Sequence, residues 1–223
     1  MNHPPPLSPA RFSPWQGKSW NALGDSITEF DQYQPRVQAV LGFSRVANYG
    51  KIATEICDGK SAQSSDQAVY GLPMSIRYAD MDPAADLVTV FGGTNDFGHN
   101  EPLGTPADTT CATFYGALKV MLAGIITANP AARVAIFTPL QRTFGGDAGV
   151  VGMTNALGLH LVDYVDAILE VAAGYSVPVL DLYRTAGISP QNAAHFLADG
   201  IHPNEAGYAR IAGQMAQFLK HIA

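Results

Sequence analysis

LGDSIT, at residues 23–28, directly follows residues 18–22, which we expect to form the first strand. Its glycine allows the backbone to turn sharply from a strand into a helix. Such a turn exposes the Ser26 hydroxyl where helix N–H groups stabilise a developing negative charge. The stretch therefore predicts a serine nucleophile. A plain helix cap at Ser26 or Thr28 is the alternative, which this stretch alone favours.

Short apolar runs alternate with helical periodicity along the rest of the chain. Further strands are expected at residues 44–48, 87–91, 134–137 and 177–180. Helices are expected at residues 34–41, within 52–78, and at 114–129, 157–171 and 208–222. This alternation predicts parallel pairing with right-handed crossovers, and therefore a three-layer αβα sandwich of the α/β class. Pro178 should keep the last strand out of the centre of the sheet. In such sheets, ligands bind beyond the carboxyl ends of the strands.

Length and composition indicate the class of protein. With 223 residues and 47% hydrophobic content, the chain suits one domain, placed at residues 16–223 behind a proline-rich arm at residues 1–15. A formal net charge of −6 argues against a nucleic-acid partner. The sequence shows neither a membrane-spanning run nor a signal peptide, so we expect a cytoplasmic protein, or a secreted one if a leader was removed. A homo-oligomer is left open.

DGIHPN, at residues 199–204, precedes the last expected helix. An aspartate three residues before a histidine, on a turn closed by Pro203, can direct both side chains toward one point. His202 could then accept the Ser26 proton, while Asp199 orients the imidazole and stabilises its cation. Serine is a weak nucleophile and needs such a base. Simple capping of the helix by Asp199 and His202 is the alternative, and the one that this stretch alone favours.

Two further stretches end predicted strands. GGTND, at residues 92–96, follows a buried strand, so Asn95 can present an amide N–H to an oxyanion. NYG, at residues 48–50, lets Gly50 offer a backbone N–H where a side chain would crowd the ligand. Together with the Ser26 N–H, these groups would give three donors for one tetrahedral oxygen.

The four blocks resemble, in order, the motifs of the SGNH hydrolases, the GDSL-type esterase and lipase superfamily. They extend from residue 24 to residue 204, and Ile27 stands where the older lipase signature has leucine. The resemblance implies a flavodoxin-like, five-stranded parallel sheet and an acylhydrolase that cleaves carboxylic esters through an acyl-serine intermediate, without cofactor or metal. It implies a catalytic triad of Ser26, Asp199 and His202. The oxyanion hole that it implies consists of the Ser26 N–H, the Gly50 N–H and the Asn95 side chain.

A glycine-rich loop after the fourth strand, with Arg142 and Phe144, should overhang the site. The residues that we expect to bind the substrate are Asp25, Thr94, His99, Arg142 and Phe144. Such walls mix polar and aromatic groups and favour small-molecule esters with short acyl groups, such as acetylated carbohydrates. A lysophospholipase or thioesterase of the same superfamily is the alternative.

Two other kinds of site compete with an esterase. A non-catalytic flavodoxin-like module could bind a phosphate or a flavin at its first loop. Such a module has no use for an acid–histidine pair together with the asparagine. Asp96 and His99 repeat the spacing of Asp199 and His202, which could indicate a metal site. No cysteine or further acid lies at matching spacing, so we expect no metal.

Overall fold

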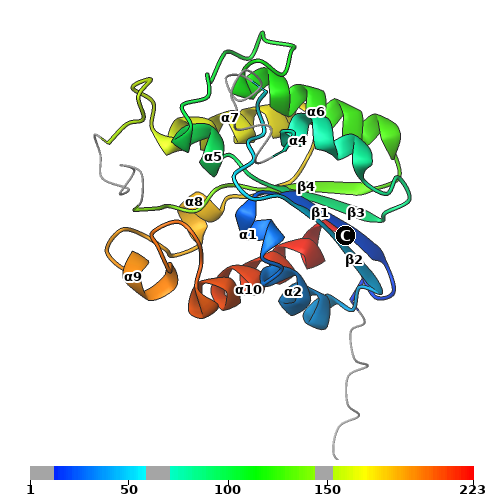
Figure 1. The fold of residues 1–223 in the computed structure, drawn as a ribbon. Coiled ribbons are helices and arrows are strands. Elements are labelled where there is room, and N and C mark those ends of the chain that lie inside the picture. The colour runs from blue at the N-terminus through cyan, green and yellow to red at the C-terminus, as the bar shows by residue number, and fades with distance from the viewer. Residues whose placement is uncertain (1–12, 59–70, 144–152) are drawn as a thin grey trace, which may run out of the picture.

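Five parallel strands form one sheet in the order β2-β1-β3-β4-β5 (Figure 1). This is the strand order of flavodoxin-like folds. The computed structural model describes residues 13–58, 71–143 and 153–223. The strands are β1 (Ser19–Gly24), β2 (Arg45–Gly50), β3 (Leu87–Phe91), β4 (Arg133–Phe137) and β5 (Val179–Leu180). β5 lies at an edge of the sheet, as we expected from the presence of Pro178.

The strand ends are in register at one edge of the sheet. Gly24, the last residue of β1, lies opposite Gly50 of β2 and Phe91 of β3. Phe91 in turn lies opposite Phe137, the last residue of β4. Because these strands are parallel, the loops that follow them begin at the same edge. The motifs after β1, β2 and β3 therefore lie close to one another.

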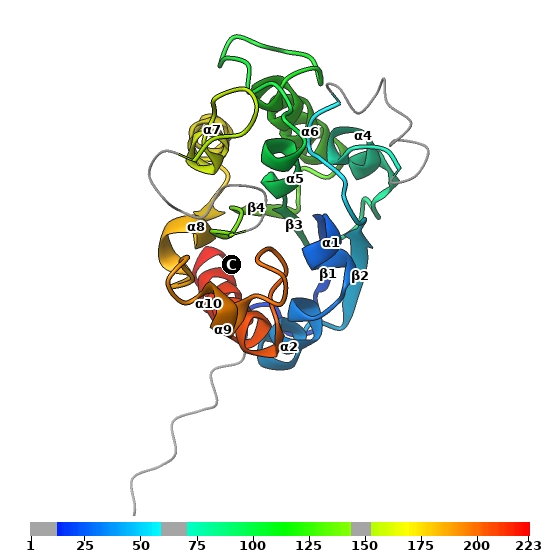
Figure 2. The same ribbon diagram turned by 60° about the vertical axis from the view of Figure 1, so that its left-hand side comes forward.

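Helices cover both faces of the sheet (Figures 1 and 2). Leu87 and Phe91 of β3 face one apolar core, while Val88 and Val90 face the other. Burial on both faces explains why β3 is an unbroken apolar run. The helices of the first core are α2 (Tyr33–Leu41) and α10 (Glu205–Ile222), and those of the second are α4 (Met74–Arg77), α6 (Phe114–Ala128) and α7 (Leu161–Gly174). The predicted three-layer α/β sandwich is confirmed.

Several short helices lie between the longer elements. They are α1 (Ser26–Glu29) after β1, the 3-10 turn η2 (Tyr78–Asp80) after α4, α5 (Thr94–Gly98) after β3, α8 (Leu182–Thr185) after β5, and α9 (Ala193–Phe196) before α10. The sequence did not predict α5, α8 or α9, because four or five residues are too few to show a helical period.

One predicted helix starts later than its apolar pattern. The periodicity indicated a helix over residues 157–171, whereas α7 begins at Leu161. Gly158 has a φ of +75°, a left-handed conformation that a helix cannot continue through. The Asp163 carboxylate then accepts the His160 N–H at 2.7 Å and fixes the start of the helix.

Trp15 belongs to the core, although the sequence placed it in the proline-rich arm. Its side chain is 5% exposed and its ring packs against Phe43, with 5.5 Å between the ring centres. The indole N–H donates to the Leu219 carbonyl at 2.7 Å. Residues 1–12 of the expected arm lie outside the described residues. In the part of the chain that is described, no helix combines the length and apolar character needed to cross a bilayer.

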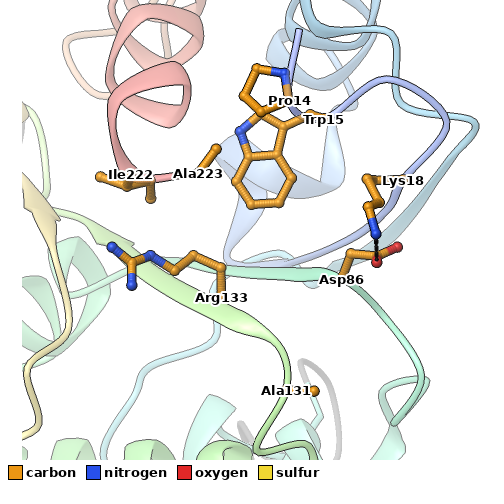
Figure 3. Close-up of a pocket in the computed structure, with 8 residues that line it drawn as sticks. All are labelled: Pro14, Trp15, Lys18, Asp86, Ala131, Arg133, Ile222 and Ala223. Carbon is orange, nitrogen blue, oxygen red and sulfur yellow. Dashed lines mark hydrogen bonds and ion pairs between the residues drawn. The ribbon is translucent and has the colours of Figure 1, made fainter.

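A hollow of about 360 Å³ lies beside Trp15 (Figure 3). Its wall includes Lys18 and Asp86, which form an ion pair at 2.9 Å, and Arg133 at the start of β4. Because these residues precede or begin strands, the hollow lies at the amino-terminal edge of the sheet. It is therefore separate from the opposite edge, where Ser26 lies.

Candidate active site

The turn between β1 and α1 places Ser26 at the first position of the helix. Asp25 caps this helix, because its carboxylate accepts the Ile27 N–H at 2.9 Å. A Cβ atom at Gly24 would lie 2.1 Å from Thr28 Oγ1, so the turn requires glycine. The Ser26 N–H is one of the first helix N–H groups, which have no acceptor inside the helix.

His202 joins Ser26 to Asp199. The Ser26 Oγ lies 2.8 Å from His202 Nε2, and His202 Nδ1 lies 2.6 Å from Asp199 Oδ2. The other carboxylate oxygen of Asp199 accepts the N–H groups of Ile201 and His202 at 3.0 and 2.8 Å. Figure 2 shows this orange segment before α10 close to the blue α1. Two motifs that are far apart in the sequence thus form one hydrogen-bonded chain.

Local contacts hold the backbone around His202. Leu197 pairs with Pro203 in an antiparallel bridge, and the Ala198 N–H donates to the His202 carbonyl at 2.8 Å. The Asn204 side chain then accepts two N–H groups in the first turn of α10, at 3.0 and 3.1 Å. These contacts therefore hold in place the turn that carries the His202 imidazole.

Asp199 carries the negative charge that can stabilise a protonated His202. Burial alone would raise the pKa of Asp199, but hydrogen bonds from the His202 ring and from two backbone N–H groups hold it below its ordinary value. The carboxylate is therefore ionised near neutral pH and can stabilise a protonated imidazole. Ser26 is 4% exposed, and the His202 side chain is 25% exposed. The arrangement can pass a proton from Ser26 to His202 while a substrate approaches from solvent.

Asn95 lies in the first turn of α5, at the same edge. Gly93 before it has a φ of +107°, which favours glycine. Asn95 Nδ2 donates to the Thr54 carbonyl at 3.0 Å. The turn that contains Thr54 is tied to the end of β1, because the Lys51 N–H donates to the Gly24 carbonyl at 3.0 Å. An amide nitrogen carries two N–H groups, so Asn95 has a second one beyond the bond to Thr54.

Gly50 ends β2 at the same edge of the sheet. Its N–H donates to Asn48 Oδ1 at 2.8 Å and is therefore already engaged. A Cβ atom at position 50 would lie 2.1 Å from the backbone nitrogen of Glu29. The glycine allows β2 to pack closely against α1. That the Gly50 N–H donates to an oxyanion stays a prediction.

Three of the predicted substrate-binding residues are buried. Asp25 is 1% exposed, and Thr94 and Arg142 are each 4% exposed. Arg142 Nη1 donates to the Thr94 carbonyl at 2.9 Å and to its Oγ1 at 3.0 Å, and the guanidinium lies 4.7 Å from the centre of the Phe97 ring. The Arg142 guanidinium thus supports the loop that contains Thr94, and contact of Asp25, Thr94 and Arg142 with a substrate stays a prediction. Phe144 lies outside the described residues.

The sequence missed a further residue of this edge, Arg77 of α4. Its guanidinium donates to the Tyr49 carbonyl at 2.8 Å, to the Gly24 carbonyl at 3.1 Å and to Thr54 Oγ1 at 2.9 Å. One side chain thereby joins the ends of β1 and β2 to the turn that holds Asn95. No local pattern in the sequence marks Arg77.

Burial raises the pKa of Asp25 to about 6, although the Ile27 N–H and the charges of His202 and Arg77 oppose this rise.

Comparison with known families identifies the chain. The model of the GDSL-like lipase/acylhydrolase family matches residues 22–210, which span both the Ser26 and the His202 motifs. The chain belongs to this family. It is therefore an ester hydrolase, and the resemblance drawn from the sequence blocks is confirmed. No curated protein matches the chain significantly.

Solved structures share the fold of this GDSL-like hydrolase. A protein from Lactobacillus plantarum is 35% identical, with a TM-score of 0.81 over 92% of this chain and 98% of the other. A lipase/acylhydrolase from Enterococcus faecalis is 22% identical, with a TM-score of 0.57 over 92% and 96% of the two chains. An inhibitor-bound aryl esterase from M. smegmatis is 18% identical, with a TM-score of 0.63 over 92% and 100%.

In this GDSL-like hydrolase, Asp96 and His99 have different partners. The His99 ring pairs through Nδ1 with the Glu55 carboxylate. Asp96 is fully buried and accepts the N–H groups of Ile56 and Cys57 at 2.9–3.1 Å. The Asp96 and His99 side chains therefore do not meet at one site, although they have the same spacing as Asp199 and His202. Within residues 13–58, 71–143 and 153–223, no group of three or more His, Cys, Asp or Glu could hold a metal ion.

We expect the pair of His99 and Glu55 to make the stability of the GDSL-like hydrolase fall as the pH rises above neutral. The hydrogen bond to Glu55 raises the pKa of His99, and the charges of Glu55, Asp96 and Glu101 add to this, while burial opposes it. A histidine whose pKa is raised in the folded state stabilises that state. This stabilisation is complete below the pKa in the unfolded chain, about 6.5, and is lost as the pH rises past the pKa in the folded protein.

The free energy of unfolding, measured with urea from pH 6 to pH 9, should therefore decline in the wild type and decline less in His99→Gln. His221→Gln is the control, because this ring is exposed and hydrogen-bonds to a backbone carbonyl, that of Gln217. The same decline in His99→Gln as in the wild type would show that the pair does not cause it.

Proposed function

We propose that this chain hydrolyses carboxylic esters through an acyl-serine intermediate on Ser26. The observation that carries the proposal is the chain of hydrogen bonds from Ser26 Oγ through His202 to Asp199, with contacts of 2.8 and 2.6 Å. A base in contact with the hydroxyl turns serine from a weak into an effective nucleophile. A module that only binds a ligand would not require this alignment.

In the first half of the reaction, His202 Nε2 accepts the Ser26 proton while Oγ attacks the ester carbonyl carbon. The carbonyl oxygen becomes negative, and the Ser26 N–H and the second amide N–H of Asn95 stabilise it. Asp199 keeps the imidazole oriented and stabilises its cation. His202 then gives the proton to the departing alcohol oxygen, which leaves the acyl group on Ser26. Water, activated by His202 in the same way, releases the acid and restores the hydroxyl.

For the substrate we propose small esters with short acyl groups, of which acetylated carbohydrates are one form. The residue types beside the motifs support this choice, because Asp25, Thr94 and Arg142 are polar and do not form a long apolar trough. A lysophospholipase or thioesterase would use the same three residues on a longer acyl chain or a thiol leaving group. Acyl length therefore separates these activities.

The test is a series of p-nitrophenyl esters from acetyl to dodecanoyl, followed by labelling with a p-nitrophenyl phosphonate. We expect the highest kcat/KM for the shortest acyl groups, and one phosphonyl group on the peptide that contains Ser26. A maximum at long acyl chains would favour the lipase-like alternative. A folded protein that neither hydrolyses any of these esters nor takes up the label would contradict the proposed function and favour a binding module.

A further inference from the structure

Phe30 is an exposed aromatic residue next to the proposed nucleophile. It ends α1, and its N–H donates to the Ser26 carbonyl at 3.0 Å, so it follows Ser26 by one helical turn. Residues four positions apart lie on the same side of a helix. The Phe30 ring packs against the His202 ring, with 5.3 Å between the centres and 49° between the planes. Ser26, His202 and Phe30 therefore form one continuous surface.

Phe30 differs in exposure from its aromatic neighbour along the chain. Phe30 is 44% exposed, whereas Tyr33 is fully buried. Ile52, which is 42% exposed, lies close by, because its N–H donates to the carboxylate of Glu29, the residue before Phe30. A single exposed apolar side chain is ordinary on a protein surface. Two of them beside a nucleophile give a substrate an apolar surface to contact.

The position of Phe30 relative to the reacting groups indicates which half of an ester it would meet. His202 has to reach the departing alcohol oxygen in order to protonate it, so the alcohol lies on the His202 side of the ester carbon. The carbonyl oxygen lies on the Asn95 side, where the amide is held by Thr54. Phe30 packs on His202 and is therefore on the side of the alcohol.

We propose that Phe30 is a specificity-determining residue that contacts the alcohol part of the ester and favours flat, apolar alcohols such as phenols and naphthols. This inference rests on the proposed function. An aromatic alcohol group that packs against the Phe30 ring is stabilised by the ring–ring contact, and covering exposed apolar surface adds to the effect. Removing the ring should therefore cost about tenfold in kcat/KM for an aryl ester relative to a small alkyl ester.

The experiment compares two series of esters on the wild type and on Phe30→Ala. The first series keeps acetyl and varies the alcohol: trifluoroethyl, phenyl and 2-naphthyl acetate. The second keeps trifluoroethanol and varies the acyl group: acetate, butyrate and hexanoate. The ratio of wild-type to variant kcat/KM is taken for each ester, which cancels the intrinsic reactivity of the leaving group. Val40→Ala is the control, because Val40 is 56% exposed on α2 and has no place in the site.

We expect the ratio for Phe30→Ala to rise about tenfold from trifluoroethyl to naphthyl acetate and to stay constant along the acyl series, with Phe30→Trp restoring the aryl preference. Val40→Ala should give ratios near one throughout. An equal loss for every alcohol would overturn the proposal and show that Phe30 only positions His202. A ratio that changes with acyl length would also overturn it, by placing Phe30 on the acyl side. Failure of the proposed function is distinguishable, because the wild type would then neither hydrolyse the esters nor be phosphonylated at Ser26.

Discussion

Ser26→Ala is expected to lower kcat for p-nitrophenyl acetate on the order of 10⁴-fold to 10⁶-fold, with almost no change in melting temperature. The variant cannot form the acyl bond, and His202 loses the hydroxyl that lies 2.8 Å from its Nε2. Folding should be unaffected, because Asp25 caps α1 through the Ile27 N–H. Stopped assays with enzyme in excess can measure the residual rate above the spontaneous hydrolysis of the ester.

Thr28→Val provides a matched control for the loss of a hydroxyl in the same helix. Thr28 Oγ1 is buried and lies 3.0 Å from the Tyr33 hydroxyl, away from the reacting groups. Its removal should cost about 1 kcal/mol of stability and leave kcat within about twofold. Comparable losses of kcat in the two variants would mean that damage to α1, and not loss of the nucleophile, explains the result for Ser26→Ala.

Asn95→Ala is expected to lower kcat by about 10²-fold to 10³-fold with little change in KM. The second amide N–H of Asn95 is proposed to meet the oxygen only once it carries negative charge, so its loss affects the transition state more than the bound substrate. The variant also leaves the Thr54 carbonyl without its 3.0 Å partner, which should reduce the free energy of unfolding by about 1 kcal/mol. Steady-state kinetics and urea unfolding separate the two effects.

Asn129→Ala removes the same kind of hydrogen bond at the other edge of the sheet. Asn129 Nδ2 donates to the Ala85 carbonyl at 2.8 Å, after α6 and before β3. We expect a similar loss of stability with unchanged kcat. If Asn95→Ala retains wild-type turnover, Asn95 has no part in stabilising the oxyanion. If both variants lose turnover equally, destabilisation accounts for the loss.

The sequence was informative where a short motif follows a strand. Asp199 and His202 are three residues apart, and local hydrogen bonds in their turn suffice to align them. Ser26 and Asn95 lie at one edge of the sheet because the parallel strands β1 and β3 end there. The strand positions were predictable for the same reason, since burial on both faces leaves unbroken apolar runs.

Side-chain direction was much harder to predict. Arg142 follows β4 in a glycine-rich loop, where a charged residue usually faces solvent, yet its guanidinium is buried against Thr94 and Phe97. The pair of Glu55 and His99 joins positions 44 residues apart, which no local pattern encodes. A lone glycine is equally ambiguous, because close packing of two backbones requires it as much as a nearby ligand does.

The two halves of the Ser26–His202 contact come from opposite ends of the chain, 176 positions apart. The ends are also tied to each other elsewhere, where Trp15 binds the Leu219 carbonyl across 204 positions. During synthesis, β1 therefore leaves the ribosome long before the segment that supplies the base. With Ser26 as the nucleophile that we propose, a nascent or truncated chain has a serine without its proton acceptor. We therefore expect hydrolysis to begin only after the segment that carries His202 has docked beside α1, so that activity reports a late step of folding.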